Sequence, residues 1–156
     1  MSRGFVKESD QEEAPIIPPR AALPDGQINY VTPKGLELLE TEKSELQQSR
    51  SELKTDNDTE RRRALAVIDG KLKLLQDRLN SAQLIQLKNQ PIDVVRFGAK
   101  VSFKMNGNKQ EFQIVGVDEA DVKQKKIAFT SPIAKSMTGH KVGDQFDFSL
   151  GSETKF

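Results

Sequence analysis

Three carboxylates, Asp56, Asp58 and Glu60, occur at alternate positions between two segments of helical pattern. Carboxylates combined with water ligands suit Mg²⁺ or Ca²⁺. An EF-hand is excluded, because the sixth position of such a loop would be Arg61 rather than glycine and the twelfth would be Val67 rather than glutamate. The same residues could instead cap a helix and place acidic charge at its N-terminus. On the residues alone, both interpretations stay open.

Few other residues could take part in catalysis or bind a ligand. His140 is the single histidine, there is no cysteine, and Gly139 and Lys141 place this histidine in an expected surface turn. A nucleophile–histidine pair is therefore unsupported, and the phosphate-binding glycine motifs are missing. Arg61, Arg62 and Arg63 could contact phosphate or form a solvated face. Apart from the tip acids, we expect no residues that hold a metal of the chain's own, and we expect no intrinsic enzyme activity and no cofactor.

The charge and hydropathy of the chain limit its contact with nucleic acid and membranes. The 156 residues carry 24 Lys and Arg against 23 Asp and Glu, a net charge of +1, so contact with nucleic acid has to be local. No apolar run approaches the roughly 18 residues of a membrane span, which predicts no membrane contact. The missing cysteines fit a reducing compartment. The sequence predicts a soluble, cytoplasmic protein.

The N-terminal arm, residues 1–30, holds four of the seven prolines and an acidic cluster. Prolines at this density prevent a helix, so we expect an extended or flexible segment. The alternative is that Ile16, Ile17 and Leu23 pack as an extended strap on the later domain, because exposed apolar side chains usually find a surface.

Residues 31–90 are predicted to form an antiparallel coiled-coil helical hairpin. Thr32 and Pro33 suit a helix start, and Leu39, Leu46 and Leu53 repeat every seven residues. A second apolar seam follows at Leu65, Ile68, Leu72, Leu75, Leu79 and Ala82. We expect helical structure over 33–87, a first helix of about 22 residues and roughly 33 Å, and Asp58 or Thr59 as the second cap. Gly70 should cost the second helix about 1 kcal/mol against alanine.

Residues 91–150 switch to strand alternation and give the chain an α+β fold. The pattern predicts strands at 99–105 and 111–117 around an Asn106-Gly107 turn, and another at 126–129. A short helix at 131–137 and a last strand at 144–150 complete a small antiparallel sheet domain, and 151–156 is a tail.

Several stretches of this domain carry a family resemblance. Residues 97–101, 112–121, 131–135 and Gly143-Asp144 resemble the C-terminal domain of the bacterial transcript cleavage factors GreA and GreB. Residues 32–36 and 79–85 resemble the two ends of the Gre coiled coil. The resemblance covers about residues 30–149.

The resemblance implies an FKBP-like C-terminal domain that docks at the rim of the RNA polymerase secondary channel. By match to the family's Ser-Pro segment, it places Ser131, Pro132, Ile133 and Ala134 at the docking surface. It further implies that the tip acids Asp56, Asp58 and Glu60 help hold the polymerase's own second Mg²⁺ when backtracked RNA is cut. RNA polymerase is then the partner of a monomer, with indirect nucleic-acid contact through Arg61, Arg62 and Arg63.

Two departures from the family pattern separate two versions of this function. The family's tip sequence, Gly-Asp-x-x-Glu-Asn-x-Glu-Tyr, is not present. The hairpin is shorter by about one heptad in each helix, which removes roughly 10 Å of reach. In this it is similar to Rnk, a Gre-like protein that binds polymerase without promoting cleavage. The chain is thus either a cleavage factor or, as we favour, a regulator that occupies the channel. A structural adaptor that binds other proteins is the alternative from another class.

Overall fold

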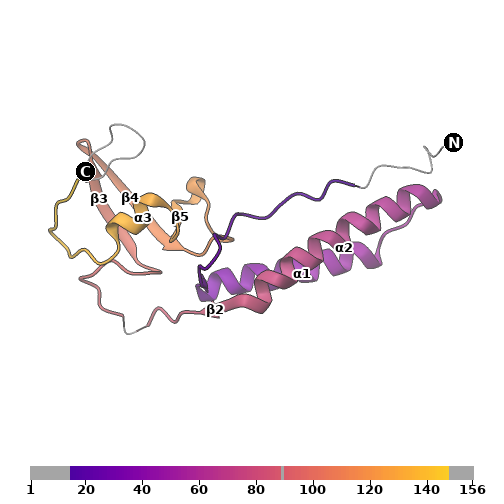
Figure 1. Cartoon of the computed structure of the whole chain (residues 1–156), viewed down its shortest axis with the longest axis horizontal. Coiled ribbons are helices and arrows are strands. Elements are labelled where there is room, and N and C mark those ends of the chain that lie inside the picture. Colours follow the sequence, from indigo (N-terminus) through magenta and orange to yellow (C-terminus); the bar gives the residue numbers. More distant parts are fainter. Residues whose placement is uncertain (1–14, 89, 148–156) are drawn as a thin grey trace.

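The computed structural model describes residues 15–88 and 90–147. Two long helices lie side by side at one end of the molecule, and a small sheet with a short helix lies at the other (Figure 1). The chain therefore has the α+β composition expected from its sequence. None of the helices in these two described ranges is long and apolar enough to cross a membrane.

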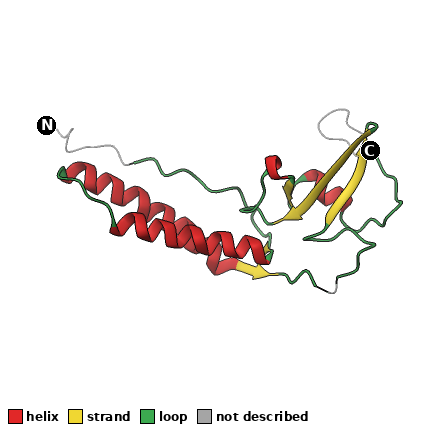
Figure 2. Cartoon of the chain, turned by 180° about the vertical axis from the view of Figure 1, so that it is seen from behind, coloured by secondary structure: helices red, strands yellow, loops and turns green. Residues whose placement is uncertain are grey.

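The helices α1 (Pro33–Ser51) and α2 (Asp58–Ser81) form a helical hairpin and run in opposite directions (Figure 2). The Thr32 side chain caps α1 by accepting the Gly35 amide, as its position in the sequence predicts. Leu39 and Leu75 are fully buried between the helices. Val31, Leu36, Leu46, Leu79 and Ala82 belong to the same apolar cluster. The 19 residues of α1 span about 28 Å, less than the expected 33 Å.

Two details of the hairpin differ from the prediction. The N-cap of α2 is Asn57, whose side chain accepts the Glu60 amide, rather than Asp58 or Thr59. In addition, α2 ends at Ser81 instead of continuing to residue 87, because β2 (Ala82–Leu84) pairs in parallel with β1 (Asn29–Val31). The sequence did not reveal these two strands, because their partners lie more than 50 residues apart and Ala82–Leu84 directly continues the apolar pattern of α2.

The second sheet contains β3 (Lys100–Met105), β4 (Asn108–Val115) and β5 (Lys126–Ala128) in that order. A tight turn joins β3 and β4, with positive φ angles of 54° at Asn106 and 82° at Gly107, as the Asn-Gly pair predicts. The pairing of β4 with β5 is parallel, so the expected all-antiparallel sheet was wrong. The connection through the 3₁₀ helix η2 (Val122–Gln124) returns the chain to the start of β5 beside β4.

The short helix α3 (Pro132–Met137) closes one side of this sheet. Ala134 and Met137 of α3 are buried with Ile114 and Ile127 of the strands, and aromatic rings surround this core. The last predicted strand is not found over residues 144–147, and its remainder, 148–150, lies outside the described residues. The predicted tail, 151–156, and the first 14 residues of the N-terminal arm lie outside them too.

The base of the hairpin is attached directly to the C-terminal domain. The Tyr30 ring packs against both Phe97 and Phe129, with centroid distances of 5.7 and 5.5 Å, and these two rings also contact each other. The Thr32 hydroxyl donates to the Glu119 carboxylate, whose side chain is 2% exposed and also pairs with Lys126 at 3.3 Å. These contacts make a packed joint, and the far end of the hairpin projects away from the domain.

Candidate functional site

The acidic residues of the tip lie at the end of the hairpin farthest from the C-terminal domain (Figure 1). Asp56, Asp58 and Glu60 are all exposed, and the Asp58 side chain retains 85% of its accessible surface. Capping is performed by Asn57, while Asp58 and Glu60 stand in the first turn of α2, where negative charge is favourable. The three carboxylates are therefore available to another molecule.

Within the described ranges, no three acidic, histidine or cysteine residues lie close enough together to hold a metal ion. The tip carboxylates are consequently not gathered into a preformed metal site. A divalent cation at the tip would need further ligands from a partner.

Positive charge follows directly after the tip acids. The Arg61 guanidinium donates to the Thr55 carbonyl at 2.9 Å and lies 3.8 Å from Asp58, and Arg62 donates weakly to the Thr59 hydroxyl. Arg61, Arg62 and Arg63 are all exposed. The first turns of α2 thus present acidic and basic groups together, and Arg61 helps to fix the turn between the helices.

The predicted docking residues lie at the start of α3. The Ser131 side chain accepts the Ala134 amide at 3.3 Å, and Pro132 is exposed at the first helical position. Ile133 is partly buried against the domain core, and Ala134 is 0% exposed. Ala134 was predicted to be part of the contact surface, but its methyl group belongs to the core because it faces the sheet. Of the four predicted residues, Ser131, Pro132 and part of Ile133 are therefore accessible to a partner.

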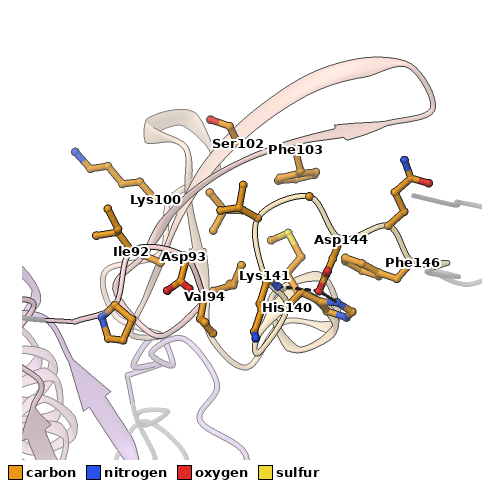
Figure 3. Close-up of a pocket in the computed structure, with 18 of the residues that line it drawn as sticks. Ile92, Asp93, Val94, Lys100, Ser102, Phe103, His140, Lys141, Asp144 and Phe146 are labelled. Atoms are coloured by element: carbon orange, nitrogen blue, oxygen red, sulfur yellow. Dashed lines mark hydrogen bonds and ion pairs between the residues drawn. The ribbon is translucent and has the colours of Figure 1, made fainter.

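His140 is one of the residues that line a cavity of about 700 Å³ between β3, the segment before it and the loop after α3 (Figure 3). Its ring stacks on Phe146 at 4.0 Å and its Nδ1 lies 3.2 Å from the Asp144 carboxylate. The pKa of Asp144 is lowered, first because the Lys141 amide donates to it and then because of His140. These contacts order the loop, and no nucleophile is bonded to His140 in the described chain.

Sequence reasoning assigned no role to a group of ionic residues between the hairpin and the C-terminal domain, namely Arg20, Glu42, Arg78 and Asp118. Asp118 belongs to a stretch that the family resemblance did include, but its partners are far away in the sequence. The Asp118 carboxylate lies between the guanidinium groups of Arg20 and Arg78, and its side chain is only 7% exposed. Among the ion-paired carboxylates of the described residues, Glu119 is more buried still, at 2%.

Residues 89–156 match the family model described as "Transcription elongation factor, GreA/GreB, C-term". This region is therefore similar to the C-terminal domain of GreA/GreB factors. Its relatives include the transcription elongation factor GreA of Maricaulis maris (strain MCS10), 46% identical over 79 residues, which are 49% of this chain and 50% of the relative. GreA of Rhodospirillum rubrum is 38% identical over 91 residues, 57% and 58% of the two chains.

The chain spans between about half and three fifths of the length of these relatives. Among solved structures, Gfh1 of Thermus thermophilus aligns at 22% identity with a TM-score of 0.35, covering 83% of this chain and 94% of that one. A GreA/GreB factor of Nitrosomonas europaea aligns at 19% identity with a TM-score of 0.37, covering 81% and 91%. Neither score is high enough to show a shared fold.

Proposed function

We propose that this protein is a transcription elongation factor that binds RNA polymerase through its C-terminal domain and directs its helical hairpin into the secondary channel. The observation that carries the proposal is the match of residues 89–156 to the GreA/GreB C-terminal domain on a chain that also projects a hairpin. In this function the FKBP-like domain binds the polymerase, the coiled-coil hairpin enters the secondary channel, and the protein acts as a monomer. The matches give no support to the adaptor alternative.

The docking surface in this proposal is the start of α3. Pro132 is exposed and held in place by the Ser131 cap, while Ala134 and Met137 anchor the helix in the core. A rigid, partly apolar projection suits a protein interface, since little conformational entropy is lost when it is covered. A change at Pro132 should therefore weaken binding to the polymerase without disturbing the core.

The tip of the hairpin distinguishes a factor that stimulates transcript cleavage from one that only occupies the channel. Asp56, Asp58 and Glu60 are exposed carboxylates that could complete the coordination of an active-site Mg²⁺ of the polymerase. A metal–oxygen bond is only about 2.1 Å long, so this role needs the tip to arrive within that distance. With α1 limited to 19 residues, about 28 Å, we favour a regulator that occupies the channel over a cleavage factor.

The docking part is tested by binding to a stalled elongation complex made with the polymerase of the native organism. Pro132→Glu should reduce binding at least tenfold. Val122→Glu is the matched control, because Val122 is an exposed apolar residue of the same domain, 73% accessible, on η2. Equal binding by the Pro132 variant, the control and the unchanged protein would refute the assignment of this surface.

The tip is tested by transcript cleavage on backtracked complexes. Binding without stimulated cleavage is the result expected of a channel-occupying regulator. If cleavage is stimulated, replacing Asp56, Asp58 and Glu60 by their amides should abolish it, while Glu40→Gln with Glu45→Gln on α1 should leave it unchanged. Cleavage that survives loss of all three tip carboxylates would rule out the tip mechanism.

A further inference from the structure

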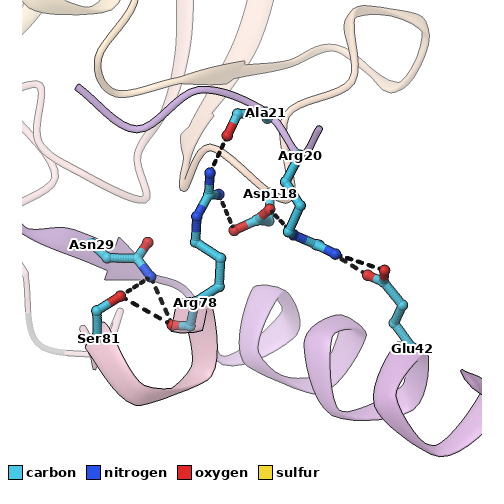
Figure 4. A network of polar contacts seen from close by, with 7 residues as sticks. All are labelled: Arg20, Ala21, Asn29, Glu42, Arg78, Ser81 and Asp118. Carbon is cyan, nitrogen blue, oxygen red and sulfur yellow. Dashed lines mark hydrogen bonds and ion pairs between the residues drawn. The ribbon is translucent and has the colours of Figure 1, made fainter. Parts of the chain in front are cut away.

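The described part of the N-terminal arm, residues 15–28, contains no helix or strand; it runs beside the hairpin to its base, where it meets the C-terminal domain. Arg20 of this segment contacts α1: its two terminal nitrogens donate to the two oxygens of Glu42 at 2.7 and 2.9 Å. Its Nε donates to Asp118 of the C-terminal domain at 3.0 Å. One guanidinium therefore connects three separate parts of the chain (Figure 4).

Arg78 of α2 completes this cluster. It donates to the second oxygen of Asp118 at 2.7 Å and also to the backbone carbonyl of Ala21 in the arm. Asp118 thus accepts one arginine on each oxygen. The side chains of Asp118, Arg78 and Arg20 are only 7%, 14% and 16% exposed, so these charges are largely removed from water.

A second contact lies farther along the hairpin. The side chain of Ile17 occupies the space beside Gly70 on α2, where a Cβ would lie 2.0 Å from the Ile17 Cδ1 atom. Gly70 is eight residues before Arg78 on the same helix, about 12 Å along its axis. The arm therefore touches the hairpin at two heights, and its Arg20 touches the domain.

The joint at the base of the hairpin lies at one end of a long lever. A rotation of about 10° there would move the far end of a 28 Å helix by about 5 Å. Bidentate arginine–carboxylate pairs have a defined geometry, and a partly buried pair resists distortion because its charges cannot regain water. One anchor of this cluster, Glu42, lies ten residues along α1 from Thr32 of the joint, so the pair is suited to limit such rotation.

From these contacts we propose that the N-terminal arm is a brace that fixes the angle between the helical hairpin and the C-terminal domain, with Arg20 and Asp118 as positioning residues. The brace is a property of the free protein. Its consequence, that the arm sets where the tip points once the domain has docked, rests on the proposed function.

The test is a distance measurement in the free, full-length chain. Because the protein has no cysteine, spin labels can be placed at Lys54→Cys near the tip and Lys109→Cys on β4, both exposed and without an ion pair in the described chain. Arg20→Gln should broaden or displace the distribution of distances between the labels, by on the order of 5 Å if about 10° of rotation is released. Arg20→Lys should have an intermediate effect, since a single ammonium cannot reproduce the fork.

Two further variants keep the result interpretable. Glu42→Gln removes only the anchor on α1, at a carboxylate that is 41% exposed, and should broaden the distribution even if Arg20→Gln lowers stability. Arg50→Gln is the matched control: it breaks an exposed arginine–carboxylate pair with Asp69 that lies wholly within the hairpin, and should change nothing. Circular dichroism confirms that each variant is folded.

Distributions for Arg20→Gln and Glu42→Gln that superimpose on that of the unchanged protein would overturn the brace. No polymerase is present in this measurement, so its outcome is independent of the proposed function. If the distances change but the protein does not bind polymerase, the brace is supported and the proposed function is refuted. If the distances do not change but the protein binds polymerase, the brace is refuted and the proposed function is supported.

Discussion

Gly70→Ala gives a quantitative test of how the N-terminal arm packs. In an exposed helix this substitution stabilises by about 1 kcal/mol, because glycine loses more backbone entropy on folding. Here the new methyl group would lie 2.0 Å from the Ile17 Cδ1 atom and 2.9 Å from its Cγ1 atom. These atoms are part of a flexible side chain, so Ile17 would move aside and α2 would stay intact.

The size of the expected change in unfolding free energy depends on the packing that Ile17 loses when it moves aside. Full burial of an isoleucine side chain contributes about 1.5–3 kcal/mol, and Ile17 is only partly buried, so about 1 kcal/mol is at stake. The gain in helix propensity and the loss of packing then nearly cancel. Gly70→Ala alone should change the free energy of unfolding by less than about 0.5 kcal/mol, but in an Ile17→Ala background it should stabilise by about 1 kcal/mol.

Urea unfolding followed by circular dichroism measures all four proteins of this double-mutant cycle. The expected coupling energy between the two positions is about 1 kcal/mol. It exceeds the roughly 0.3–0.5 kcal/mol within which the effects of mutations at distant sites add. Equal stabilisation of about 1 kcal/mol by Gly70→Ala in both backgrounds would show that Ile17 does not cover this glycine, and the packing argued for the arm would be wrong.

Three other changes test the remaining parts of the fold. Gly116→Ala should destabilise by about 1–3 kcal/mol in urea unfolding, because its Cβ would lie 2.5 Å from a backbone oxygen of β1 at the joint. Leu75→Ala should cost about 2–5 kcal/mol in the same assay, since Leu75 is 0% exposed, whereas Leu38→Ala, at 42% exposure, should cost far less. The pKa of Glu42 is lowered chiefly by its hydrogen bonds to Arg20, so this carboxylate stabilises the fold above its unfolded pKa of about 4.3, and the contribution is lost as pH falls through the lower folded pKa. Melting temperatures from pH 7 to pH 3 should accordingly fall less steeply for Glu42→Gln, and parallel curves would contradict the assignment.

The helices and the β3–β4 hairpin were predictable because their signals are local. Caps at Thr32 and Ser131 and the Asn106-Gly107 turn act over a few residues, and the structure shows each of them. Of the predicted heptad leucines, Leu39 and Leu46 pack in the hairpin cluster, whereas Leu53 lies beyond the end of α1 at Ser51. The end of α2 was not predictable, because Ala82–Leu84 leaves the helix to pair with a strand more than 50 residues earlier. The direction of β5 likewise depends on the path of its connection, which alternation does not encode.

The candidate sites divide in the same way. Exposure of Asp56 and Pro132 follows from their places in a turn and at a helix start. Burial of Ala134 depends on which side of α3 meets the sheet. The charge cluster was missed because Asp118 lies 98 residues from Arg20 and 40 from Arg78, and single charged residues at such separations show no pattern before the chain is folded.

Two properties determine where the tip acids lie relative to a docked C-terminal domain: the length of the hairpin and its angle at the joint. A loss of one heptad from each helix removes roughly 10 Å along the hairpin axis. Rotation at the joint moves the tip across that axis, by about 5 Å for 10°, and recovers almost none of the lost length. Reach and direction are therefore separate requirements, the first set by residues 33–81 and the second by the joint and the arm. If the hairpin is one heptad per helix shorter than that of a cleavage factor, stimulated transcript cleavage would mean that the domain docks closer to the polymerase active site, since rotation at the joint could not supply the missing distance.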